Sequence, residues 1–216
     1  MNTQLILSNH NKMETTHHLD NVFYPYDFRF RIGTIHNDFV AKDATGNTKA
    51  FVKQKLFKFK EHVEVFSDES RSERLYDIRA DKWLDFNTTY TITGSNDRHM
   101  GRLARKGWRS LWKASYELYN EKDQQDLVIQ EKNAWVKVAD SVLCEIPVLG
   151  LVSGYLFNPS YTVKRPDGTL VATFTKQASF FGRKFQLNQD APFNNGEELR
   201  IQLGVMMMAL LERRRG

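Results

Sequence analysis

Apolar and polar residues alternate along most of the chain, in short segments that are separated by polar turns. The clearest case is YTVKRPDGTLVATFTK (residues 161–176), where two alternating segments flank a Pro-Asp-Gly turn, which is the pattern of a β-hairpin. Four further segments repeat this pattern, and two more have the pattern of a single strand. They are residues 39–53, 62–81, 90–106 and 116–132 for the hairpins, and 23–32 and 180–187 for the single strands. Together they predict about twelve antiparallel strands.

The C-terminal segment, NNGEELRIQLGVMMMALLERRRG, has a different pattern. Asn195 followed by Glu198 predicts a helix cap, and the helix is expected from about Gly196 to about Arg214, roughly 28 Å long. Its centre, Leu203 to Leu211, is apolar on every face but is shorter than the ~20 residues that span a bilayer. An interfacial membrane helix would carry charge along one face, whereas here the charges lie only at the ends. We therefore predict a core helix that is buried on all sides.

The strands and the helix together predict one fold. A sheet of about twelve strands tends to close, and a closed barrel of that size has an interior wider than its own side chains fill. We therefore predict a mainly β protein, a closed antiparallel barrel of about twelve strands around the buried C-terminal helix. Residues 22–216 would form this single domain, and residues 1–21 a flexible tail. Residues 134–151 predict a short connecting helix on the outside, which Pro147 would end.

The order of these elements resembles a known family. The strand MGRLARKGW is followed by YELYNEKDQQDLVIQEK, then by YTVKRPDGTLVATFTKQASFFGRKFQL and the apolar terminal helix. Over residues 23–214 this order resembles the LURP-one-related branch of the tubby-like barrel superfamily, which is itself similar to the phospholipid scramblases. The resemblance implies a twelve-stranded barrel around a C-terminal helix. It implies no particular reaction, because most members have none assigned.

Composition and the N-terminal sequence predict the cellular compartment and the charge of a partner. The chain has 216 residues, a net charge of +5 and a single cysteine, Cys144, so no disulfide can form within it. The N-terminus lacks the basic and apolar regions of a signal peptide. We expect a cytoplasmic protein, at most peripheral to a membrane and without a transmembrane segment. The positive charge suits an anionic partner.

The charge is concentrated in residues 97–113, DRHMGRLARKGWRSLWK, which hold six basic residues against one acid. Basic side chains beside tryptophan suit a membrane surface, where the indole lies at headgroup level. In tubby itself basic residues on the barrel bind phosphoinositide headgroups, and the resemblance implies a similar use here without a one-to-one match. The alternative is a solvated strand face whose tryptophans pack into the barrel. The candidate lipid- or anion-binding residues are Arg98, Arg102, Arg105, Lys106, Trp108, Arg109, Trp112 and Lys113.

The sequence gives weaker evidence for metal binding and for catalysis. The loop of residues 187–198 is rich in oxygen donors that suit calcium, but it lacks the spacing of an EF-hand, and turn and cap chemistry explains it. His17 and His18 have no cysteine or histidine partner at the spacing of a metal site. Cys144 follows two apolar residues, which predicts that it is a small buried residue of the core. No catalytic motif is present. We predict no enzyme activity, no cofactor and no metal.

These observations favour a non-catalytic binding module that recognises an anionic phospholipid headgroup, phosphoinositide-like, or a protein partner. Scramblase-like lipid transfer, a protein-interaction scaffold and a barrel that holds a small apolar ligand beside its helix are the alternatives. Nucleic acid is disfavoured because no reading motif accompanies the basic residues.

Overall fold

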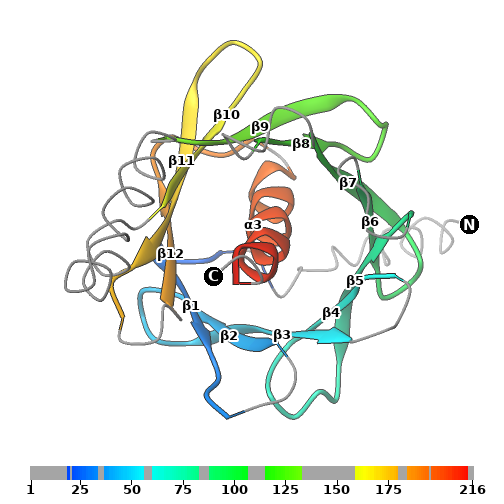
Figure 1. Ribbon diagram of the computed structural model, residues 1–216, viewed down its shortest axis with the longest axis vertical. Helices are drawn as coiled ribbons and strands as arrows, with labels where there is room; N and C mark the ends of the chain where they lie inside the picture. The colour runs from blue at the N-terminus through cyan, green and yellow to red at the C-terminus, as the bar shows by residue number, and fades with distance from the viewer. Residues whose placement is uncertain are drawn as a thin grey trace, which may run out of the picture.

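In the described part of the chain, twelve antiparallel strands close into a barrel around one helix (Figure 1). The computed structural model describes residues 19, 21–33, 37–55, 60–82, 88–106, 115–132, 159–179, 184–194 and 196–213. The strands are β1 (Tyr26–Phe30), β2 (Asp38–Lys42), β3 (Thr48–Lys55), β4 (His62–Phe66), β5 (Arg74–Ala80), β6 (Thr89–Gly94), β7 (His99–Arg105), β8 (Ser115–Tyr119), β9 (Gln125–Glu131), β10 (Ser160–Lys164), β11 (Leu170–Gln177) and β12 (Lys184–Gln189), and the helix is α3 (Glu197–Arg213).

Each strand pairs with the next along the chain, and β1 closes the ring by pairing with β12. In that closing pair Tyr26 lies opposite Leu187 and Phe28 opposite Phe185. Closure removes the exposed edges that an open sheet of this size would have. The predicted fold, a mainly β closed antiparallel barrel of about twelve strands, is confirmed.

The alternation in the sequence separates the inner from the outer face of the wall. In β6, for example, Tyr90, Ile92 and Gly94 are buried while the threonines between them are partly exposed. The strands that flank the closure add aromatic side chains to the lumen, where the Phe28 and Phe174 rings meet edge to face at 5.7 Å. Side chains on the inner face therefore form one continuous core.

Helix α3 fills the lumen. Fourteen of its 17 residues are buried, and Met206, Met207 and Met208 have no exposed surface. The expectation of a buried helix from Gly196 to Arg214 is confirmed within one residue at each end. Glu197 accepts a hydrogen bond from the backbone N–H of Asn194 at 2.8 Å, and the predicted cap residue Asn195 lies outside the described residues. Among the described residues no helix is long and apolar enough to cross a membrane.

Two expectations fall largely outside the described residues: the connecting helix at 134–151 and the N-terminal tail. Of that tail the structure describes Leu19 and Asn21, and Leu19 is fully buried in the core.

Candidate functional site

The described part of the predicted basic stretch, residues 97–106, follows β7, and the structure pairs its outward-facing cations with acids. The Arg98 guanidinium lies 2.8 Å from Glu121, Arg102 Nε donates to Asp123 at 2.8 Å, and Lys106 Nζ lies 3.1 Å from Glu117. Glu117 is on β8, and Glu121 and Asp123 lie in the turn between β8 and β9. Because β8 pairs with β7, this turn and strand bring carboxylates alongside the basic residues.

The acids change the charge of this surface. Each of the three outward cations in the described part of the stretch has its own acidic partner: Glu121 for Arg98, Asp123 for Arg102 and Glu117 for Lys106. The Arg98 and Lys106 side chains are nevertheless 57% and 51% exposed. Ion pairs this exposed contribute little to stability, and other anions can replace their acidic partners.

One further contact fixes this surface. The Arg102 guanidinium lies 3.6 Å from the centre of the Tyr119 ring, a cation–π contact that orients it along the wall. Arg105 does not belong to this outer face: it follows Leu103 by two residues and lies opposite Tyr116, so its side chain points toward the inside of the barrel near Tyr90. Its buried Nε has no hydrogen-bond partner among the described residues. The remaining predicted site residues, Trp108, Arg109, Trp112 and Lys113, lie outside the described residues.

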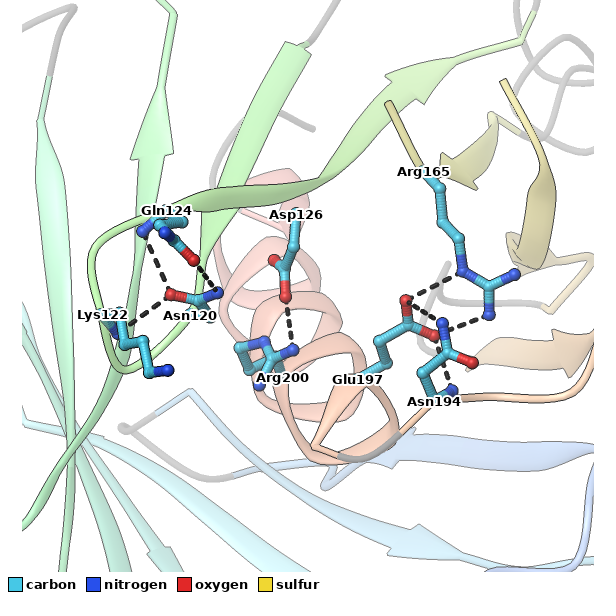
Figure 2. A network of polar contacts seen from close by, with 8 residues as sticks. All are labelled: Asn120, Lys122, Gln124, Asp126, Arg165, Asn194, Glu197 and Arg200. Carbon is cyan, nitrogen blue, oxygen red and sulfur yellow. Dashed lines mark hydrogen bonds and ion pairs between the residues drawn. The ribbon is translucent and has the colours of Figure 1, made fainter. Parts of the chain in front are cut away.

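A second polar cluster lies at the mouth of the barrel where α3 begins (Figure 2). Arg165, just after β10, directs its Nε and Nη2 at the two carboxylate oxygens of Glu197 at 2.9 and 2.8 Å. These hydrogen bonds hold the pKa of Glu197 below its usual range, against burial, which raises it. Glu197 in turn accepts the backbone N–H of Asn194. This pair of hydrogen bonds between Arg165 and Glu197, called the fork below, therefore ties the start of the helix to the strand wall.

Beside this pair, Arg200 of α3 forms an ion pair with Asp126 of β9, the strand that neighbours β10 (Figure 2). Arg200 is 8% exposed, and its Nε has no partner among the described residues. Burial raises the pKa of Asp126, and the Arg200 guanidinium opposes that rise. A Cβ on Gly196, whose φ is +73°, would lie 2.7 Å from Arg200 Nη1, so glycine leaves room for the guanidinium.

The Arg200 side chain borders an open pocket of about 360 Å³ between α3 and the β8–β9 turn. Inside the turn, Asn120 Oδ1 accepts the backbone N–H groups of Lys122 and Gln124, which fixes its shape (Figure 2). Lys122 makes no ion pair among the described residues. The pocket is lined by Asn120, Glu121, Lys122, Gln124, Gly196 and Arg200.

The β8–β9 turn joins the pocket to the described part of the basic stretch. Glu121, in the pocket wall, is the partner of Arg98, and Asp123 in the same turn is the partner of Arg102. Sequence reasoning found the β7 side of this surface and missed the pocket. The missed residues lie in a turn and at a helix start whose proximity depends on how α3 sits in the barrel.

The oxygen-rich loop before α3 has local roles in the structure. Asp190 accepts a hydrogen bond from Thr173 at 2.7 Å, and the backbone N–H of Asn194 donates a hydrogen bond to the Glu197 carboxylate. Glu198 accepts from the Tyr24 hydroxyl at 3.0 Å and from Gln202 at 3.2 Å. These contacts agree with the interpretation of the loop as turn and cap chemistry.

Comparison with protein families gives one match. A model of the LURP-one-related family matches residues 48–192, well over half of the chain. The matched range contains β7, β8 and the β8–β9 turn, and ends before α3. Neither the curated proteins nor the solved structures compared with the chain gave a match.

Proposed function

The chain belongs to the LURP-one-related family, and on that premise we propose that it is a non-catalytic module that binds anionic phospholipid headgroups at a membrane surface. Family membership suggests a lipid-binding domain of the tubby-like kind. The observation that carries the proposal to particular residues is the outer face of β7 and the β8–β9 turn, where Arg98, Lys106 and Lys122 are exposed and Arg102 is partly exposed.

The filled lumen supports binding on the outside. Helix α3 packs against wall side chains such as Leu118 and Ile129, which have no exposed surface. Among the described residues the helix and the inner face of the wall form one continuous core, which favours binding on the outside over a ligand held in the lumen. Binding on the outer wall is therefore the proposal, in preference to lipid transfer or to a ligand held beside the helix.

A headgroup phosphate would take the place of the acids on this surface. Arg98, Arg102 and Lys106 already direct their charges at carboxylate oxygens, and phosphate oxygens can accept the same hydrogen bonds. Lys122 adds a cation at the rim of the pocket. Arg109 and Lys113 would add positive charge, and Trp108 and Trp112 would lie at headgroup level, whereas Arg105 points inward and is left out of the proposed surface.

Charge reversal on two opposite walls tests the proposal. Arg98→Glu/Lys106→Glu changes two exposed residues of the proposed surface. Arg29→Glu/Lys184→Glu is the matched control, because β1 is six strands from β7 around the ring and Arg29 is also an exposed arginine paired with an acid. The measurement is binding of each purified variant to vesicles that contain phosphatidylserine or a phosphoinositide.

Each basic residue near an anionic membrane contributes about 1 kcal/mol, so loss of two predicts binding weaker by roughly 30-fold or more. The control should bind within about twofold of the unmodified chain, since its wall does not face the membrane. Equal loss in both double variants would show that only net charge matters and would remove the assignment to β7. Unchanged binding in both double variants would also remove the assignment to β7.

A further inference from the structure

A different cluster of charged residues lies on the outer wall of β4 and β5. Glu64 and Asp77 are direct cross-strand partners, and both point outward because Val63, Val65 and Ile78 beside them pack into the core. They are nevertheless only 6% and 4% exposed. Two like charges placed opposite each other on neighbouring strands destabilise a sheet unless positive charge lies beside them. This position therefore requires a cation.

His62 completes a set of three potential ligands. It precedes Glu64 by two residues on β4, so its side chain lies on the same face, and its Nε2 is hydrogen-bonded to Asp77 Oδ1. One ligand atom from each of His62, Glu64 and Asp77 lies within 4.8 Å of the other two. One imidazole nitrogen and two carboxylate oxygens form a ligand set that zinc accepts, with a fourth position left for water.

Flexible side chains supply the positive charge in the structure as it stands. Lys55 Nζ lies 2.5 Å from Glu64, Arg74 Nη1 lies 3.1 Å from Asp77 and 3.8 Å from Glu64, and Arg79 Nη2 lies 3.6 Å from Asp77. All three are long side chains, 36%, 42% and 62% exposed, that can turn into water. The ammonium and guanidinium groups of these side chains lie where the two carboxylates stabilise positive charge. A divalent ion at that point would bring two positive charges between the carboxylates.

We propose that His62, Glu64 and Asp77 bind a divalent transition metal of the zinc type that joins β4 to β5. Zinc–ligand bonds of about 2.0–2.2 Å place ligand atoms about 3.4 Å apart, which side-chain rotation reaches from the present separations. Calcium and magnesium fit less well, because they prefer six or more oxygen ligands. The site lies on a different part of the wall from β7, and its test does not depend on lipid binding.

Calorimetric titration of the full chain with zinc chloride tests the proposal, with cobalt(II) absorption as a direct report of nitrogen and oxygen coordination. We expect one metal ion per chain, and binding weaker by tenfold or more in His62→Ala and in Asp77→Asn. His99→Ala is the matched control, because His99 lies 3.8 Å from a single acid, Asp123, and should leave zinc binding unchanged. Lys55→Ala should bind zinc more tightly, because it removes the competing cation from Glu64.

Three results would overturn the metal site: no zinc binding by the unmodified chain, equal binding by His62→Ala, or weaker binding by Lys55→Ala. Circular dichroism of each variant shows whether it is folded. Should His62→Ala be unfolded, Glu64→Gln decides the matter, because it keeps the size of the side chain and removes the anionic ligand.

Discussion

Gly204 lies in the middle of α3, at a close approach of the helix to the wall. A Cβ at this position would be 2.9 Å from Leu118 Cδ2, 3.4 Å from Leu118 Cδ1 and 3.7 Å from Ile129 Cδ1. Carbon atoms in ordinary contact are about 3.5–4.0 Å apart, so the first distance is about 0.6 Å too short. Glycine therefore lets the helix lie against β8 and β9, and we predict that larger residues at 204 destabilise the fold.

Two effects of Gly204→Ala oppose each other. Alanine favours a helix interior by about 1 kcal/mol over glycine. Leu118 is fully buried, so moving its end strains a packed core at a cost of about 1–3 kcal/mol. The net expectation is a loss of about 0–2 kcal/mol in the free energy of unfolding. Gly204→Val adds two methyl groups beyond the Cβ and should cost more than Gly204→Ala.

A double-mutant cycle isolates the contact. Leu118→Ala alone should cost about 2–5 kcal/mol, because it opens a cavity. Combined with Gly204→Val, it should cost less than the sum of the two by about 1 kcal/mol or more, because valine enters the vacated space. Urea unfolding followed by circular dichroism gives all four free energies. A stabilising Gly204→Ala of about 1 kcal/mol, together with additive costs in the cycle, would refute the close contact.

Two further predictions concern the mouth and β7. Because hydrogen bonds from Arg165 lower the pKa of Glu197 from 4.5, their stabilisation is present above pH 4.5 and is lost as the pH falls through the lower folded value. Thermal unfolding of Arg165→Ala should therefore lose less stability between pH 7 and acid than the unmodified chain, and an unchanged pH dependence would contradict the fork. Gly101→Ala should cost on the order of 3 kcal/mol in urea unfolding, because φ is +122° and the new Cβ would lie 2.3 Å from the Tyr119 carbonyl oxygen; a cost under about 1 kcal/mol would contradict it.

The fold could be predicted because the information that specifies it is local. Each hairpin carries its own alternation and turn, as at Asp167, which accepts the backbone N–H of Thr169 in the β10–β11 turn. The helix carries its own apolar centre and charged ends. Closure then follows from strand number, so no single long-range contact had to be known in advance.

The site could be predicted only in part, because its contacts depend on register. Residues 97–113 have a charge of +5 along the sequence, yet Arg98 meets Glu121 across 23 residues of chain. The same holds for His62 and Glu64, whose shared face is evident from their spacing, whereas Asp77 joins them only through the pairing of β4 with β5. Arg165 and Glu197, 32 residues apart, meet only once α3 has entered the barrel.

Binding of the unmodified chain to anionic vesicles as a function of salt tests the central claim most directly. The screening length falls from about 30 Å at 0.01 M to about 8 Å at 0.15 M salt, so exposed cations on the wall should lose much of their attraction over this range. The account predicts binding at low salt that rises with phosphoinositide or phosphatidylserine content and weakens steadily as salt is added. Absence of binding at low salt, or binding that neither salt nor lipid charge changes, would contradict the proposal that this barrel recognises anionic headgroups through its outer wall.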